Sequence, residues 1–197
     1  MQLAVFSANR FAHLAVVRHG RLLSLPAGAK ITDILSLSQS DRDYMDGQSG
    51  KHLNAPLGTY PLLSPIVGGD SSDLLDAASR DEAPVYGPHS AIELPSGSPI
   101  SGKANVAPLT LGGEIVGYCL ELALFAGQSS SPFARAYGPW ITTVSELSGF
   151  KSDSGHTFAL TAMVNGKESD LSQLHAGDTL SLQAEGLGLL ENTLSHS

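Results

Sequence analysis

Residues 176–194 read Ala176-Gly-Asp-Thr-Leu-Ser-Leu-Gln-Ala-Glu-Gly-Leu-Gly-Leu-Leu-Glu-Asn-Thr-Leu194, and no other stretch of the chain is as informative. Its opening Ala-Gly-Asp is typical of a tight turn, and alternating apolar residues then predict a strand with one buried face. Gly186-Leu-Gly188 predicts a reversal, because glycine adopts the positive φ that such turns need. We therefore predict a β-hairpin near the C-terminus.

The composition is that of a mainly β protein. The chain has 197 residues, 42% of them hydrophobic and 15% charged, with 21 glycines and 11 prolines. This length fits one domain with a substantial core, and the glycines and prolines favour many turns and few long helices.

Short apolar runs predict further strands. A β-meander is expected at Leu3–Phe6, Leu14–Val17 and Arg21–Leu25. Residues 33–58 are polar apart from a short helical patch, and we interpret them as an exposed loop or part of a small lobe. Side-chain oxygens that can cap amide protons predict a short helix at Asp73–Arg80.

The rest of the chain also reads as strands. The predicted strands are Leu120–Phe125, Trp140–Val144 and Phe158–Val164. Asn165-Gly166 predicts a type I′ hairpin turn. We divide the chain into an N-terminal meander and loop lobe, residues 1–58, and a main β domain, residues 59–197, which pack as one compact unit.

Charge and cysteine content limit the partners and the location. The formal net charge is -8, which repels phosphate backbones and anionic lipid, so we predict neither a nucleic-acid nor a membrane partner. Cys119 has no second cysteine with which to form an intrachain disulfide. We expect a cytoplasmic protein without a signal peptide, because charged residues interrupt the first apolar runs.

Several motifs resemble one family in the same order along the chain. Gly138-Pro-Trp-Ile-Thr-Thr-Val-Ser-Glu-Leu147, Val164-Asn-Gly-Lys-Glu168 and the hairpin at 176–194 resemble consecutive elements of the fumarylacetoacetate hydrolase family. Ala83–Ile100 and Tyr60–Pro65 are similar to its upstream segments. The resemblance implies a mainly β (α+β) fold with few short helices, a shortened version of the family's mixed β-roll, and association into a homodimer or with a homologous subunit.

The resemblance also implies a metal-dependent reaction on a 2-keto or 1,3-diketo substrate, but residues that the reaction needs are missing. The family's loop with a catalytic His and Glu corresponds to residues 68–76, which contain no histidine. Gly87 stands where the family has a lysine, and the nearby His89 has a different length and pKa.

The metal ligands are incomplete in both alignments that the sequence allows. One sets Tyr118–Gly127 on the family's Glu-x-Glu strand, so that Cys119 replaces the first ligand and Glu121 retains the second. The other sets the same region on a later strand, and Ala123 then replaces the third ligand. A single carboxylate binds a divalent cation weakly, so we predict no metal site and no cofactor.

The remaining candidates are few. Cys119 and Glu121 share one face of a strand and, with His89, are the catalytic candidates. Candidate ligand-binding residues are Arg135, Tyr137, Trp140, Tyr118 and Tyr86, since aromatic and arginine side chains often anchor ligands. Structural roles are the alternative for each: a buried cysteine, a loop histidine, a core tryptophan.

Loss of the chemistry and survival of the scaffold predict a catalytically degenerate relative, a pseudoenzyme. In this reading it is a metal-free binding protein for a small organic molecule or peptide precursor, with a role in specialised metabolism or biosynthesis. Two alternatives stay open. One is a metal-independent isomerase, cyclase or lyase, and the other an accessory subunit of a catalytic homologue.

Overall fold

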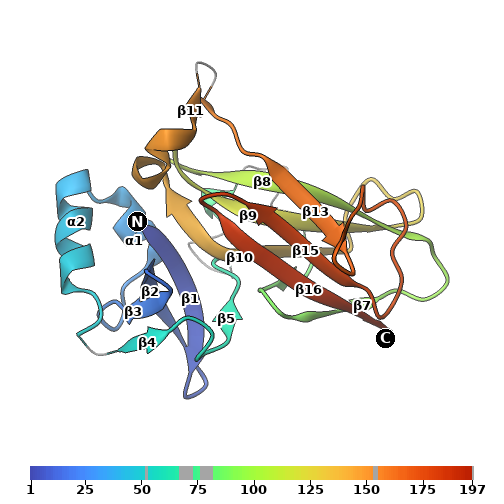
Figure 1. Cartoon of the computed structure of the whole chain (residues 1–197), viewed down its shortest axis with the longest axis horizontal. Helices are drawn as coiled ribbons and strands as arrows, with labels where there is room; N and C mark the ends of the chain where they lie inside the picture. Colours follow the sequence, from blue (N-terminus) through green and yellow to red (C-terminus); the bar gives the residue numbers. More distant parts are fainter. Residues whose placement is uncertain (52, 67–72, 76–81, 153–154, 197) are drawn as a thin grey trace.

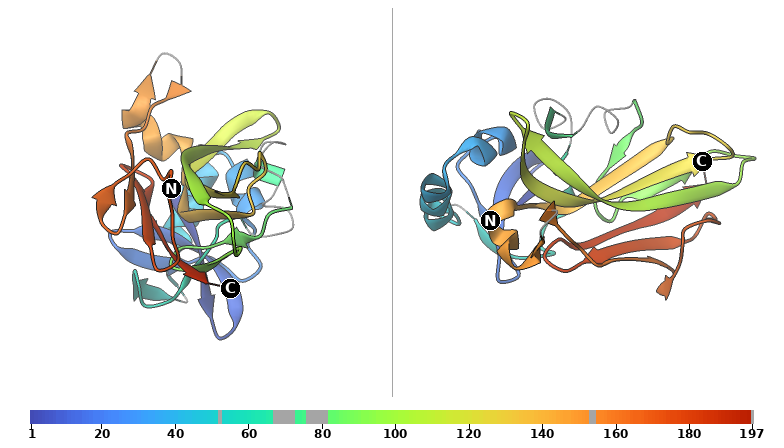
Figure 2. Two further views of the ribbon diagram at one scale, coloured as in Figure 1. Left: turned by 90° about the vertical axis from the view of Figure 1, so that its right-hand side faces the viewer. Right: turned by 90° about the horizontal axis from the view of Figure 1, so that it is seen from above.

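Two β-sheets stacked face to face make up most of the molecule (Figure 1, Figure 2). The computed structural model describes residues 1–51, 53–66, 73–75, 82–152 and 155–196. Within these residues the larger sheet has nine strands and the smaller has five, and a two-stranded ribbon lies apart from both. The helices flank the larger sheet at the end that holds the N-terminus (Figure 1).

The larger sheet contains the predicted meander. Its order is β4-β3-β2-β1-β10-β9-β8, with β5 paired to β1 and β6 paired to β10. The strands are β1 (Gln2–Ala8), β2 (Phe11–Arg18), β3 (Arg21–Ser24), β4 (Asn54–Pro56), β5 (Leu62–Leu63), β6 (Val85–Tyr86), β8 (Ile100–Leu111), β9 (Glu114–Ala126) and β10 (Ala134–Thr143). The first 58 residues thus contribute strands to the same sheet as β8, β9 and β10.

The smaller sheet contains both predicted hairpins. Its order is β14-β13-β15-β16-β7, from β7 (Ala91–Leu94), β13 (Leu160–Val164), β14 (Lys167–Glu168), β15 (Thr179–Ala184) and β16 (Gly188–His196). Asn165 and Gly166 have φ of 51° and 75°, as a type I′ turn requires. Gly186 and Gly188 also have positive φ, which confirms the predicted reversal.

Successive side chains of β9 contribute alternately to two hydrophobic cores, one on each face of the larger sheet. Leu120, Leu122 and Leu124 are buried between the two sheets. Cys119 belongs to a second cluster on the opposite face of the larger sheet, where it packs with Leu74 and other apolar side chains. Because successive side chains of a strand point to opposite faces, one strand serves both cores.

The polar segment 33–58 contains a helix that the sequence did not predict. We expected one helical patch and otherwise loop, but α1 (Ile31–Ser36) is followed by α2 (Gln39–Gln48). No residue of α2 is buried, so it lacks the apolar periodicity by which helices are recognised. Ser38 caps it by accepting a hydrogen bond from the Asp41 amide at 3.2 Å.

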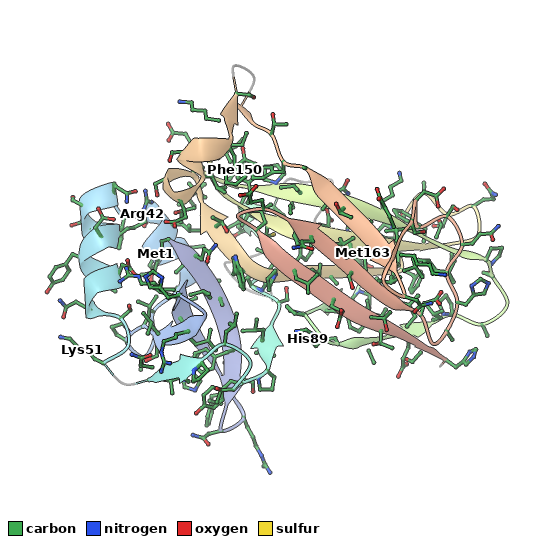
Figure 3. All side chains as sticks on the ribbon, viewed as in Figure 1. Met1, Arg42, Lys51, His89, Phe150 and Met163 are labelled. Atoms are coloured by element: carbon green, nitrogen blue, oxygen red, sulfur yellow. The ribbon has the colours of Figure 1, made fainter. Side chains whose placement is uncertain are left out.

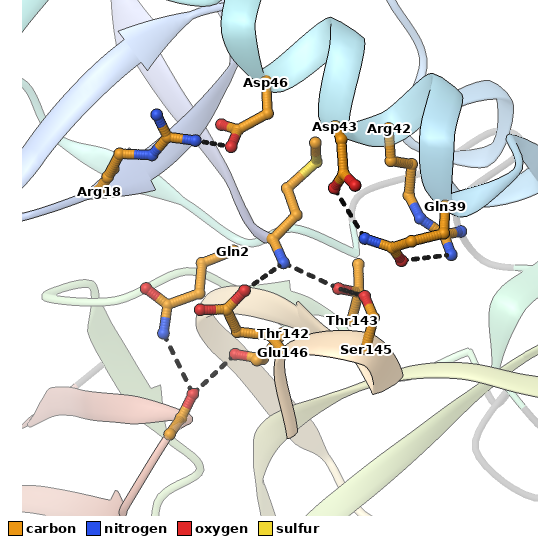
Figure 4. Close-up of polar contacts among 12 residues, drawn as sticks. Gln2, Arg18, Gln39, Arg42, Asp43, Asp46, Thr142, Thr143, Ser145 and Glu146 are labelled. Carbon is orange, nitrogen blue, oxygen red and sulfur yellow. Dashed lines mark hydrogen bonds and ion pairs between the residues drawn. The ribbon is translucent and has the colours of Figure 1, made fainter. Parts of the chain in front are cut away.

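Polar contacts tie α2 and the closing hairpin to the first strands (Figure 4). Arg18 on β2 forms an ion pair with Asp46 on α2. The carbonyl of Gly186, in the turn of the hairpin, accepts hydrogen bonds from Gln2 at 3.2 Å and from Thr142 at 2.8 Å. The hairpin turn is therefore fixed to both β1 and β10.

A 3₁₀ segment and a two-stranded ribbon follow β10. The 3₁₀ segment η3 (Val144–Phe150) leads into the ribbon of β11 (Lys151–Ser152) and β12 (Gly155–His156). Most of the helix expected at 73–80 lies outside the described residues. None of the helices in the described ranges is long and apolar enough to span a membrane.

Candidate functional site

A buried polar cluster surrounds Glu121 in the middle of the larger sheet. The register of β8, β9 and β10 places Asn105 and Tyr137 directly beside Glu121, with Arg135 two residues from Tyr137 on the same face. Glu121, Arg135 and Tyr137 are 4%, 8% and 0% exposed. Oε1 of Glu121 forms an ion pair with the Arg135 guanidinium and accepts a hydrogen bond from the Tyr137 hydroxyl at 2.9 Å. The Asn105 amide approaches Oε2 at 3.5 Å.

Burial keeps the neighbouring acids neutral. It raises the pKa of the Cys119 thiol well above its usual range, and the Glu121 carboxylate raises it further. The pKa of Tyr137 is raised by burial first, and then by the same carboxylate, to which its hydroxyl donates. The cluster therefore holds one carboxylate, one guanidinium, a protonated thiol and a protonated phenol, and the two charges compensate each other.

This donor set does not suit a divalent metal ion. A hard cation needs several oxygen ligands that carry negative charge. Oε1 of Glu121 is already engaged by a guanidinium and a hydroxyl, and Cys119 holds its proton. No group of three His, Cys, Asp or Glu side chains in the described part of the chain could hold a metal. A metal at Glu121 would have to displace Arg135 and leave its charge buried.

The thiol gives a test of this environment. We expect Cys119 to resist alkylation by iodoacetamide at about pH 8.5 in the folded protein and to react once the protein is unfolded in urea, because only the thiolate is nucleophilic. Mass spectrometry measures the labelling. Rapid labelling of the native protein would contradict the burial.

The same raised pKa values predict a pH dependence. As pH rises past the unfolded pKa values of about 8.5 for Cys and about 10 for Tyr, the unfolded chain releases protons that the folded chain retains. The contribution of these two groups to the free energy of unfolding is therefore fully present below about pH 8 and is lost as the pH rises further. A Cys119→Ala variant should lose less stability between about pH 8 and pH 10 than the parent.

The other predicted residues lie apart from this cluster. His89 (Figure 3) is 64% exposed in the side chain, and its Nδ1 lies 3.9 Å from Glu191 Oε1. Tyr86 pairs beside Ala136, so it faces the core between the sheets. Trp140 packs against the apolar side chains of the meander strands, such as Phe6 and Leu22. Only Glu121, Cys119, Arg135 and Tyr137 come together, and part of the loop aligned with the family's His and Glu, residues 68–72 and 76, lies outside the described residues.

Tyr118 lies in a different place, an open cleft of about 550 Å³ at the edge of the two sheets. Its hydroxyl lies 3.3 Å from His156 Nδ1. Phe158 packs against both rings, with centroid distances of 5.1 Å to Tyr118 and 6.4 Å to His156. The sequence did not predict His156 or Phe158 as site residues. Their one signal is a spacing of two, which puts both rings on one side of an extended segment.

Comparison with known proteins identifies the class of fold. No family model matches the sequence, and no curated protein matches it either. Solved structures do match over 100% of both chains. They include maleylpyruvate hydrolase from Sphingobium sp. SYK-6 (14% identity, TM-score 0.77), 5-carboxymethyl-2-hydroxymuconate delta-isomerase from Mycobacterium smegmatis (16%, 0.62) and a fumarylacetoacetate hydrolase from Exiguobacterium antarcticum (14%, 0.61).

These structures are members of the fumarylacetoacetate hydrolase superfamily. The chain therefore has the fumarylacetoacetate-hydrolase-like fold, and the predicted mainly β fold class is confirmed. At this level of identity the likeness establishes the fold and leaves the activity to be argued from the site.

Proposed function

We propose that this chain is a metal-free binding protein built on the fumarylacetoacetate-hydrolase-like fold. One observation carries the proposal: Glu121, the one carboxylate left from the implied ligand set, is neutralised by Arg135 and Tyr137. A structure of the maleylpyruvate hydrolase contains manganese(II) and pyruvate. Here the Arg135 guanidinium neutralises Glu121 instead.

We place the ligand in the cleft of Tyr118, His156 and Phe158. Its volume of about 550 Å³ is within the range of small-molecule sites. Tyr118, His156 and Phe158 give it aromatic faces, a hydroxyl and an imidazole, and Thr157 also lines it, which suits a small organic molecule or a peptide side chain. In this proposal Arg135 and Tyr137, expected as ligand contacts, join β10 to β9, which is one of the strands that line the cleft.

Two titrations test the proposal. Mn²⁺ and Mg²⁺ at about 1 mM should not raise the Tm. A metal site with a Kd below about 1 mM would be occupied at this concentration and would stabilise the folded state. The fluorescent dye 8-anilinonaphthalene-1-sulfonate should bind the native protein. Binding should be lost in Phe158→Ala and kept in Tyr44→Ala, a control at an exposed tyrosine on α2. Tight metal binding, or dye binding unaffected by Phe158→Ala, would count against it.

A second candidate, a metal-independent isomerase, is favoured by the Tyr118–His156 pair. Burial raises the pKa of Tyr118 and so keeps its hydroxyl protonated, and this hydroxyl lies 3.3 Å from Nδ1 of His156. Such a pair can pass a proton to or from a bound substrate. Turnover lost in both Tyr118→Phe and His156→Gln, but kept in Cys119→Ser, would favour the enzyme. The buried thiol of Cys119 would then have no part in the reaction.

A further inference from the structure

The free edge of β8 is already used by the chain itself over its first residues. The Leu174 amide donates to the Ile100 carbonyl at 3.0 Å, and the Gly102 amide donates to the Leu171 carbonyl at 2.8 Å. Ile100 and Leu174 form an antiparallel bridge. Residues 171–174 thus contact this edge through two backbone hydrogen bonds, although Leu171 has φ of 60° and only Leu174 forms a β-bridge. The outward amides and carbonyls of β8 can therefore pair with a neighbouring backbone.

The next two outward positions on the same edge are unoccupied by any described backbone. Backbone directions alternate along a strand, and the β8 to β9 register is regular from Ile100 to Leu109. Ala104 and Val106 therefore point their amides and carbonyls the same way as Gly102. No backbone hydrogen bond reaches either residue from that side within the described ranges. Pro108, which has no amide proton, ends the row.

This open part of the edge forms one wall of the aromatic cleft. Ala104 and Val106 line the cleft together with Tyr118, His156 and Phe158. Their side chains point into the space between the sheets, where they pack against the central core. Leu160, at the start of β13, lines the other wall. Backbone hydrogen-bonding groups and an aromatic pocket therefore meet at one site.

We propose that the ligand of this cleft is an extended peptide segment that adds to β8 as a further, antiparallel strand. This inference rests on the proposed binding function and specifies its ligand class. The peptide would continue the edge where residues 171–174 leave off. Its backbone would pair with Ala104 and Val106, and alternate side chains, large and apolar, would enter the cleft against Tyr118 and Phe158. A small ring compound would leave the amides and carbonyls of both residues without a partner.

The pairing rule gives a sharp test with a blocked alternating peptide, acetyl-Thr-Leu-Thr-Leu-Thr-Leu-Thr-amide. In an antiparallel pairing, like that of Ile100 with Leu174, residues opposite Ala104 and Val106 direct their amides to β8 and their side chains into the cleft. N-methylation of the leucines should weaken binding by at least about tenfold, since it removes the hydrogen bonds to β8. N-methylation of the threonines, whose amides face solvent, is the matched control and should leave binding within about twofold. Displacement of the bound dye measures both.

A protein variant tests the same edge from the other side. Val106→Pro removes one outward amide at a strand edge, where proline is tolerated, as Pro108 shows. The variant should keep its Tm but lose most of the peptide affinity, measured directly by isothermal titration calorimetry. Equal binding of the two methylated peptides would overturn the inference.

Two further outcomes separate this inference from the proposed function. If the dye binds the cleft but no peptide displaces it, the peptide ligand is wrong and the binding function stands. If sedimentation shows a dimer that Val106→Pro converts to monomer, and no peptide binds, a second copy of the chain occupies the edge and the inference fails. If the dye does not bind the unmodified protein at all, the proposed function itself is contradicted.

Discussion

Arg135→Ala is expected to lower the free energy of unfolding by about 3–5 kcal/mol, the largest effect of any single substitution that we propose. The variant would leave the Glu121 carboxylate buried next to Tyr137 and Cys119, without the guanidinium that compensates its charge. Urea unfolding, followed by the fluorescence of the single tryptophan, measures the change.

The matched control for this prediction removes both charges. In Glu121→Leu with Arg135→Met the apolar side chains fill a similar space, and we expect a stability within about 1–2 kcal/mol of the parent. A loss of less than about 1 kcal/mol in Arg135→Ala would show that the carboxylate is not dependent on Arg135. A gain of Mn²⁺ binding in that variant would show that the guanidinium excludes the metal.

Gly188→Ala is expected to lower the free energy of unfolding by about 3 kcal/mol, from overpacking and backbone strain together. A Cβ at this position would lie 2.5 Å from Cζ2 of Trp140 and 2.8 Å from Cγ of Pro139, and φ is +87°. In a chain of this length such a loss lowers the Tm by about 6–12 °C. Thermal unfolding followed by circular dichroism measures it.

Gly166→Ala is the control, because it introduces a similar backbone strain at positive φ without a steric contact to another side chain. Gly166 has φ of +75°, and a Cβ added there would meet no other atom within 4 Å. The substitution should cost about 1 kcal/mol. Equal losses in the two variants would mean that the contact with Trp140 contributes nothing.

The elements that the sequence predicts well are those with local signals. Gly186 and Gly188 mark a reversal in their own dihedral angles, and Asn165-Gly166 marks a turn in the same way. Helix α2 has no such signal, because none of its side chains is buried and its cap is a single serine. The resemblance to the family predicts the fold class because it depends on these strand and turn residues.

The candidate site is less predictable because it depends on register. Arg135, Tyr137 and Glu121 each attract attention in the sequence, but as separate candidates. Only the pairing of β9 with β10 shows that two proposed ligand contacts neutralise the third residue. Both sequence alignments around Tyr118–Gly127 place the altered positions, Cys119 and Ala123, on the face that carries Glu121. The cleft depends on a contact between Tyr118 and His156, 38 residues apart, which no local pattern contains.

The pairing of β1 with β10 also determines how the chain can fold. Leu3 lies opposite Ile141, so the first residues of β1 have their partner far along the sequence, whereas Val5 and Phe6 pair with the nearer β5. At synthesis rates of about 5–20 residues per second, the meander waits roughly 7–30 s for that partner to be made. Non-local pairing of this kind makes folding slow. The start of β1 thus leaves the ribosome without its partner strand, and the joining of the meander to β10 is a late event in the life of the nascent chain.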